Sequence, residues 1–256
     1  MSVSFSASAT DPTGRITGYT YTFGDELLPF VSFDGTASHT YNETGKYTVK
    51  VIAYDDGHYS SQPAYLHILV MKRSSFTDQK LIDTDYTWAK DAIDYIYTFN
   101  IAEGYPDGSY RPDVYTKRSE MAAFIARAMD IKIPQSCTVS PFSDVNTDSW
   151  YCPYIEALKE AGIRMNTNGS NNYYPAEPMS RADMALFLAQ AAHLKITPCS
   201  TSPFPDVAKD AWYCPYVQAI KLAGITKGFP DGTYRPDDTV TRAQMAVYLF
   251  RAFGER

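Results

Sequence analysis

The chain has 256 residues, a length that predicts two or more domains of ~100–200 residues each. Apolar residues make up 45% and charged residues 20%, so the composition is typical of a folded soluble protein and excludes disorder. The net charge of −6 argues against nonspecific nucleic-acid binding, and no apolar run approaches the ~20 residues that span a bilayer.

Residues 1–73 predict a small antiparallel β-sandwich of the immunoglobulin-like kind. Apolar and polar residues alternate there in four runs, which turn clusters such as Asp11–Gly14 and Asp55–Gly57 separate. The apolar positions are Val3, Phe5 and Ala7; Tyr19, Tyr21 and Phe23; Tyr47, Val49, Val51 and Ala53; and Leu66, Ile68 and Val70. Residues 1–5 read as a strand rather than a signal peptide, so we expect any export signal to lie outside this sequence.

An internal repeat of about 60 residues occupies the rest of the chain. Its three copies are predicted at residues 74–133, 134–195 and 196–256. The features that recur in register are a Phe-x-Asp start (Phe76, Phe142, Phe204), a tryptophan (Trp88, Trp150, Trp212) and an arginine (Arg118, Arg181, Arg242). A unit this short cannot bury its apolar face alone, so we expect the copies to pack around a shared core.

Each copy is predicted to fold as helix, loop, helix. The first helix is indicated by spaced apolar residues such as Ile155 and Leu158, and Gly162 follows as the expected stop. The second helix has the clearer stripe, for example Met121, Phe124 and Ile125. The C-terminal region is therefore expected to be mainly α-helical.

Four cysteines form two pairs with the same spacing in nearly identical surroundings: Cys137 with Cys152, and Cys199 with Cys214. A zinc site would usually show Cys-x-x-Cys knuckles, which are absent, so disulfides within each pair are favoured over a metal. Disulfides persist mainly outside the cytosol, which predicts an extracellular protein.

The repeats resemble the S-layer homology (SLH) family. Copy three carries that family's pattern as Phe204–Val207, Trp212, Gly224-Ile225, Gly228–Gly232, Pro236 and Thr241–Gln244. The resemblance implies a bacterial cell-surface module that binds a secondary cell-wall polysaccharide, often pyruvylated, in grooves between repeats arranged with pseudo-threefold symmetry.

The N-terminal region resembles PKD domains. The resemblance is carried by Tyr19–Asp25, His39–Tyr41 and Gly45–Val49, although Glu26 stands where that family usually has glycine. It implies an extracellular spacer or interaction module.

The arginine that follows each helix start is the candidate ligand-binding residue. Ser180 and Thr241 are expected N-caps, with Asp183 and Gln244 in capping-box positions. A cation in the first helical turn opposes the helix dipole, so something should compensate it. A bound carboxylate or phosphate held by free backbone N–H groups and the guanidinium would do so.

The SLH resemblance extends this candidate carbohydrate site to glycine and tryptophan residues. Its members are Arg118, Arg181, Arg242, Gly104, Gly228, Trp88, Trp150 and Trp212. The alternative is that each arginine pairs with Asp78, Asp144 or Asp206 and that the tryptophans are core residues.

Two copies depart from the pattern. In copy two, Asn166 replaces the glycine and Tyr174 replaces an arginine, so its groove is the most doubtful. In copy one, Lys117 takes the cap position, where Thr116 could substitute by a shift of one residue.

Four alternatives to carbohydrate anchoring follow from the sequence. Catalysis and a cofactor are not expected, because the histidines are scattered and the aspartate pairs fall in turns. Calcium binding by Asp11, Asp25, Asp55 and Asp56 lacks EF-hand-like spacing, so no metal site is expected. The remaining rivals are a subunit of a surface lattice or filament that assembles with other surface-layer chains, and the non-catalytic end of a larger extracellular enzyme.

Overall fold

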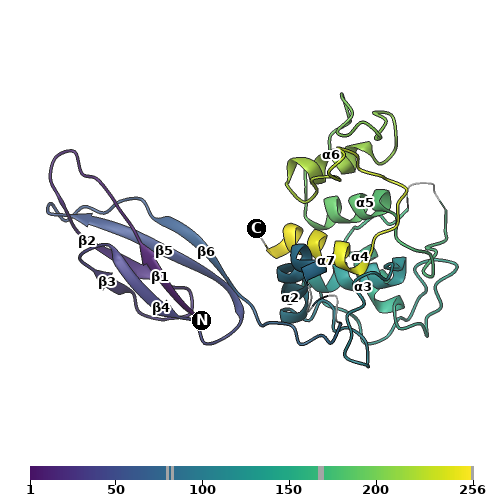
Figure 1. The fold of residues 1–256 in the computed structure, drawn as a ribbon, viewed down its shortest axis with the longest axis horizontal. Helices are drawn as coiled ribbons and strands as arrows, with labels where there is room; N and C mark the ends of the chain where they lie inside the picture. Colours follow the sequence, from purple (N-terminus) through teal and green to yellow (C-terminus); the bar gives the residue numbers. More distant parts are fainter. Residues whose placement is uncertain (79–80, 82–83, 167–169, 255–256) are drawn as a thin grey trace. The chain divides into compact units, whose positions relative to one another are not determined.

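The computed structural model describes residues 1–78, 81, 84–166 and 170–254 (Figure 1). The chain divides into two compact units, Met1–Lys72 and Arg73–Arg256. No helix among the described residues is long and apolar enough to cross a membrane.

The first unit is an antiparallel β-sandwich of two sheets. One sheet has two strands in the order β1-β4, and the other has four in the order β3-β2-β5-β6. The strands are β1 (Ser2–Ser6), β2 (Ile16–Thr22), β3 (Phe30–Ser32), β4 (Thr36–Thr40), β5 (Gly45–Asp55) and β6 (Ala64–Val70). The predicted all-β sandwich is confirmed.

The alternating residues of this unit form its core. Phe5, Tyr21, Phe23 and Val49 are buried between the sheets, because side chains two residues apart on a strand share a face. The Tyr21 hydroxyl donates to the carbonyl of Gly35 at 2.6 Å. The short strands β3 and β4 were not predicted, since neither segment contains a long alternating run.

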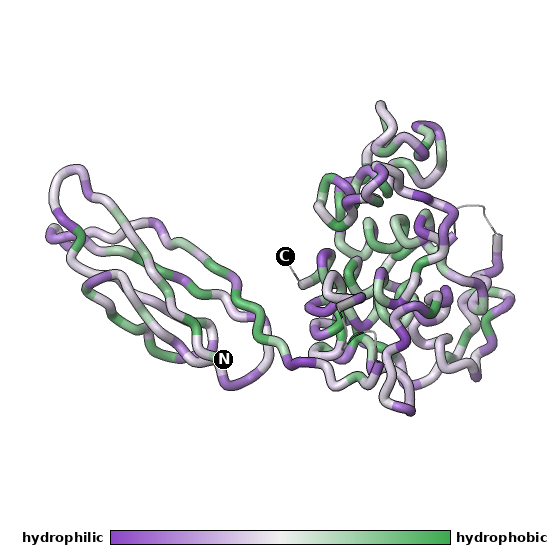
Figure 2. The backbone as a smooth tube through the Cα atoms, viewed as in Figure 1, coloured by the Kyte–Doolittle hydropathy of each residue, from purple (hydrophilic) through white to green (hydrophobic). Residues whose placement is uncertain are grey.

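The second unit is helical and contains two α-helices from each repeat. They are α2 (Lys90–Thr98) and α3 (Arg118–Ala128), α4 (Cys152–Glu160) and α5 (Arg181–Ala191), and α6 (Cys214–Leu222) and α7 (Arg242–Leu249). A 3-10 helix, η1 (Thr84–Ala89), precedes α2, and a π-helical turn, η2 (Phe250–Gly254), follows α7. Figure 2 shows that hydrophobic residues are concentrated along α5, which is buried along most of its length. The predicted helical region is confirmed.

The repeats pack in a closed cycle. The second helix of each repeat contacts the first helix of the next, in the pairs α3 with α4, α5 with α6, and α7 with α2. The residues just before the second helices form a triangle of backbone hydrogen bonds, in which Thr116 N donates to Val240 O, Val240 N to Met179 O, and Met179 N to Thr116 O, at 2.8–2.9 Å. Each repeat therefore depends on both of the others.

The starts of the second helices agree with the predicted caps in two repeats of three. The Ser180 Oγ accepts from Asp183 N at 3.0 Å, and the Thr241 Oγ1 accepts from Gln244 N at 3.3 Å. In the first repeat the proposed shift to Thr116 is wrong: Lys117 is the N-cap, and its N–H donates to the Glu120 carboxylate at 2.9 Å. The Thr116 hydroxyl is buried without a hydrogen-bond partner among the described residues.

Both predicted disulfides are present, Cys137–Cys152 and Cys199–Cys214. Each ties the start of a repeat's first helix to the segment before it. Each bond should stabilise its repeat by ~3 kcal/mol in the chain-entropy model, because it closes a loop of about 15 residues.

Candidate functional site: the inter-repeat grooves

The three motif arginines lie at the junctions between repeats, where each is at most 5% exposed. Each donates from Nε to the carbonyl of a tyrosine in the next repeat, and that tyrosine's hydroxyl donates back to the arginine's own carbonyl. The pairs are Arg118 with Tyr173, Arg181 with Tyr234, and Arg242 with Tyr110, with all six hydrogen bonds between 2.6 and 2.8 Å. The arginines therefore have a structural role at every junction.

The tyrosines were missed by the sequence reasoning. A signal for them was present, because Tyr110, Tyr173 and Tyr234 precede a proline by two residues and recur with the same spacings as the arginines. All three are fully buried, and burial raises the pKa of each phenol well above its ordinary value of about 10.

The backbone N–H groups at the helix starts are not free, so that part of the expected anion site is wrong. The Arg181 N–H donates to Asp238 O and the Ala182 N–H to Pro236 O, both in the next repeat. The third N–H, of Asp183, is held by the Ser180 cap. The same bonds to the next repeat recur at Arg118 and Arg242. Any anion at these sites would have to be held by side chains.

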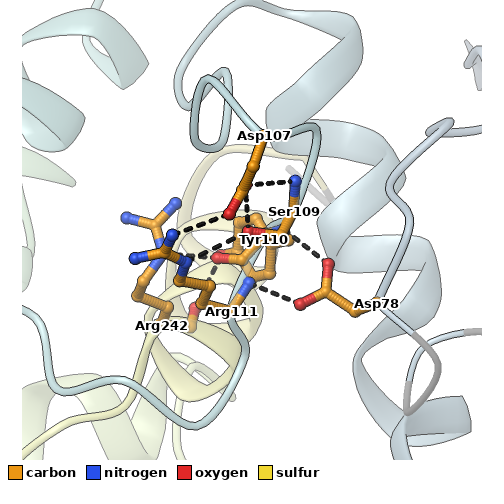
Figure 3. A network of polar contacts seen from close by, with 6 residues as sticks. All are labelled: Asp78, Asp107, Ser109, Tyr110, Arg111 and Arg242. Atoms are coloured by element: carbon orange, nitrogen blue, oxygen red, sulfur yellow. Dashed lines mark hydrogen bonds and ion pairs between the residues drawn. The ribbon is translucent and has the colours of Figure 1, made fainter.

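The expected alternative, an ion pair from each arginine to Asp78, Asp144 or Asp206, is also wrong. Figure 3 shows that Asp78 instead accepts from the backbone N–H groups of Tyr110 and Arg111, at 2.5 and 2.8 Å. Asp144 and Asp206 accept the equivalent bonds in their own repeats. These aspartates hold the turn that carries the buried tyrosine, which explains their recurrence.

The loop between the two helices of a repeat is held by a second carboxylate. In the first repeat, Asp107 accepts from the Ser109 N–H and hydroxyl and from the Arg111 guanidinium at 2.5–2.9 Å (Figure 3). Asp231 makes the same contacts in the third repeat. These bonds, led by the hydroxyl, hold the pKa of both carboxyl groups well below their usual range.

The tryptophans are not core residues. Trp88, Trp150 and Trp212 are 55%, 58% and 43% exposed, respectively. Large exposed aromatic rings are available to bind a partner, and one of them lines a groove in this structure.

That groove has a volume of about 440 Å³ and is built by all three repeats. Arg181 comes from the second, Gly228 and Phe229 from the third, and Trp88 from the first; Thr226, Lys227, Pro230, Gln244, Val247, Tyr248 and Arg251 complete its lining. The volume lies within the ~300–1,000 Å³ that is typical of small-molecule sites. The structure thus brings together three of the predicted site residues: Arg181, Gly228 and Trp88.

Both predicted glycines occupy turns that require glycine. Gly104 and Gly228 have φ angles of +82° and +74°. A Cβ on Gly228 would lie 2.6 Å from the Phe204 ring and 2.7 Å from the Thr233 carbonyl oxygen, and Gly104 has the equivalent close neighbours. In the second repeat Asn166 takes this place, and its amide donates to Asn172 O at 2.5 Å.

The junction around Arg118 is filled by the protein's own polar groups. The guanidinium lies 2.9 Å from Asp183 Oδ2 and donates to Met165 O at 3.0 Å and Asn166 Oδ1 at 3.3 Å. The sequence indicated that the groove of the second copy is the most doubtful of the three. In the structure, Asn166 and Asp183 of that copy already contact the Arg118 guanidinium.

The acidic turns of the β-sandwich serve local contacts. Asp25 pairs with His39 at 2.8 Å, Asp11 accepts from Thr13, and Asp55 accepts from Tyr59 N. Among the residues that the structure describes, no group of three or more His, Cys, Asp or Glu side chains is arranged to hold a metal ion.

Comparison with known families assigns the chain. The model of the S-layer homology domain matches residues 76–122, 141–185 and 203–246, together more than half of the chain. The chain belongs to the S-layer homology family. The PKD domain family matches residues 1–69, so a PKD domain precedes three SLH repeats.

Curated relatives carry this SLH region in different settings. An uncharacterized cell wall amidase of Bacillus anthracis is 28% identical over 72% of this chain and 34% of its own length. An amylopullulanase of Thermoanaerobacterium thermosulfurigenes is 30% identical over 68% of this chain and 9% of the enzyme. An S-layer protein of Bacillus licheniformis is 27% identical over 63% of this chain and 18% of that protein. The chain thus spans about a third or less of these relatives.

The SLH assignment and these relatives define an extracellular cell-surface protein that contains a cell-wall anchoring module. The SLH and PKD families are not catalytic.

Proposed function

We propose that the SLH unit anchors the protein by binding an anionic secondary cell-wall polysaccharide in its inter-repeat grooves. The observation that carries this proposal is the Arg181 groove, where a buried guanidinium, an exposed tryptophan and an apolar wall lie together. A sugar offers apolar C–H faces to aromatic rings, and an acidic substituent offers oxygens to a guanidinium. The PKD domain would act as a spacer or interaction module.

The residues proposed to bind the polymer are those of the SLH motif: Arg118, Arg181, Arg242, Gly104, Gly228, Trp88, Trp150 and Trp212. An acidic substituent such as a pyruvate ketal would suit the guanidinium, because Arg–carboxylate pairs form short, charge-assisted hydrogen bonds. Arg181 supports this role because its terminal nitrogens make no hydrogen bond or ion pair with any described residue.

Co-sedimentation with purified cell-wall sacculi tests the proposal. The full chain should pellet with intact sacculi and remain in the supernatant once the wall polymer has been chemically extracted. Equal retention on extracted sacculi would contradict it, because binding would then be to peptidoglycan or to the pellet itself.

A second candidate function, assembly into a surface lattice or filament, is favoured by a different observation. The PKD domain exposes adjacent apolar side chains before and within its edge strand β3: Leu27 is 102% exposed, Leu28 78% and Val31 55%. Exposed apolar residues on a strand edge favour association with another chain. Sedimentation velocity without polymer should show concentration-dependent growth that a Leu27→Ser, Leu28→Ser variant abolishes; a monomer at all concentrations would reject this function.

A further inference from the structure

We propose that the three inter-repeat grooves are not equivalent: the Arg181 groove holds the anionic sugar, whereas the Arg118 and Arg242 grooves are neutralised by the protein's own carboxylates. This inference rests on the proposed function and names the groove and the residues that select the ligand. It follows from the charges at equivalent positions of the three repeats.

Among the described residues, the Arg181 groove is lined by three cations and no carboxylate. Arg181, Lys227 and Arg251 contribute the charges. Gln244 occupies the third position of helix α7, where the two other repeats have an acid, and it lines the groove. A groove with one sign of charge and low-dielectric walls concentrates counter-ions, so this groove attracts anions.

The guanidinium of Arg181 is also held in a fixed position, which favours ligand binding. Its side chain is buried, and its Nε donates to Tyr234 O at 2.6 Å, which fixes the guanidinium. The guanidinium carbon lies 4.6 Å from the centroids of both the Phe229 and the Tyr234 rings. Its two terminal nitrogens, with no partner among the described residues, remain to bind an anion.

The Arg118 junction already contains its anion. Asp183, the counterpart of Gln244, lies 2.9 Å from the Arg118 guanidinium, and the Arg118 side chain is only 7% exposed. Met165 stands at the position equivalent to Lys227, and its carbonyl takes another hydrogen bond of the guanidinium. A second anion would have to displace a protein carboxylate from a buried pair, which is costly.

The Arg242 junction has two acids at positions where the Arg181 groove has a cation and an amide. Glu103 stands directly before Gly104, where the third repeat has Lys227 before Gly228. Glu120 stands at the third helical position, where the third repeat has Gln244. At these equivalent positions the junction carries two cations, Arg242 and Arg127, and two acids in place of three cations and an amide, while Arg242 itself has no ion pair among the described residues. The geometry of this junction otherwise matches that of Arg181.

The ligand that fits the Arg181 groove is a sugar unit with an acidic substituent. The substituent would bind Arg181, with Lys227 and Arg251 adding charge at the rim, and the sugar ring would lie against Trp88. A neutral sugar would leave three cations uncompensated, so the groove should discriminate strongly against it.

Three matched variants test the choice of groove: Arg118→Gln, Arg181→Gln and Arg242→Gln in the full chain, each checked for native circular dichroism. Co-sedimentation with polymer-bearing sacculi should weaken at least about tenfold for Arg181→Gln, since one charge-assisted hydrogen bond is worth that much. The Arg118→Gln and Arg242→Gln variants should each lose clearly less affinity than Arg181→Gln, because acidic residues already stand at their junctions. Equal losses in all three, or a loss confined to Arg118→Gln or Arg242→Gln, would overturn the inference.

The Gln244→Glu variant tests the charge without disturbing the fold. Glutamate already fills this position in the first repeat as Glu120 and caps its helix there, so α7 should form normally. The variant should bind sacculi at least about fivefold more weakly than wild type, because it places a carboxylate beside Arg181. The control Glu120→Gln should not weaken binding. Unchanged binding by Gln244→Glu would contradict the charge argument.

A small probe separates failure of the inference from failure of the proposed function. The probe is a methyl hexoside with a pyruvate ketal, and its neutral methyl ester is the control. The acid should change tryptophan fluorescence in wild type but not in Trp88→Phe, and the ester should have no effect. If wild type ignores sacculi yet responds to the acid through Trp88, the anchoring function fails and the groove inference stands. If neither sacculi nor acid binds, both fail.

Discussion

At the scale of single residues, each junction is an exchange of hydrogen bonds between one arginine and one tyrosine. Tyr234 and Arg181 bond to each other's backbone carbonyls, and both side chains are buried. The arginine thus serves the fold through Nε and leaves its terminal nitrogens for other contacts. In the proposed function, the ligand therefore binds atoms of this side chain that the fold does not use.

This division predicts that Tyr234→Phe destabilises the helical unit by ~1 kcal/mol, because the hydrogen bond from the phenol to the Arg181 carbonyl is lost. Urea unfolding followed by circular dichroism measures the change. Sacculus binding should persist, since Arg181 still donates to the Tyr234 carbonyl. Loss of binding in a folded variant would contradict the division.

The buried tyrosines also predict that the stability of the helical unit falls at alkaline pH. Burial raises the pKa of Tyr110, Tyr173 and Tyr234, so their contribution is fully present below the unfolded pKa of about 10. As the pH rises above about 10, the unfolded state loses its phenol protons first, and the free energy of unfolding falls. Urea titrations at pH 8 and pH 11 should show this fall, and Tyr234→Phe should reduce it. An equally large fall in the free energy of unfolding of Tyr234→Phe would contradict the explanation.

At the scale of elements, the sequence predicted the helices, the alternating strands and the disulfides because local periodicity and spacing determine them. It did not predict strands β3 and β4, whose pairing depends on neighbours distant in the chain. The backbone N–H groups at the helix starts were also expected to be free. Those groups bond to Asp238, Pro236 and their counterparts across the junction, a contact that no local pattern reveals.

The sequence predicted which residues belong to the candidate site, but not that they lie together. Arg181, Gly228 and Trp88 were each recognised from the recurrence of a motif, yet their meeting in one groove requires three repeats to close a cycle. The proposed difference in charge between the grooves arises because Gln244 stands in the third repeat where Asp183 stands in the second. Its effect can be inferred only from the structure, which shows the arginine that each residue lies near.

The disulfides give a prediction at this scale. The Cys199→Ser, Cys214→Ser variant should lower the free energy of unfolding of the helical unit by ~3 kcal/mol, because the unfolded chain gains the entropy of an open loop. Chemical denaturation under non-reducing conditions measures it. A change below about 1 kcal/mol would indicate that the bond contributes little beyond the packing around it.

At the scale of the whole chain, a PKD domain precedes an SLH unit whose repeats are mutually dependent. The triangle of Thr116, Met179 and Val240 closes only when all three repeats are present. The Arg181 groove likewise takes walls from every repeat. Anchoring is therefore expected to be a property of the complete SLH unit rather than of any one repeat.

The most direct measurement is calorimetric titration of the full chain with the purified wall polymer, before and after its acidic substituents are removed by mild hydrolysis. We expect the intact polymer to bind at one groove per chain and the neutral polymer not to bind. Equal affinity for both forms would contradict the claim that an anion at Arg181 anchors this protein.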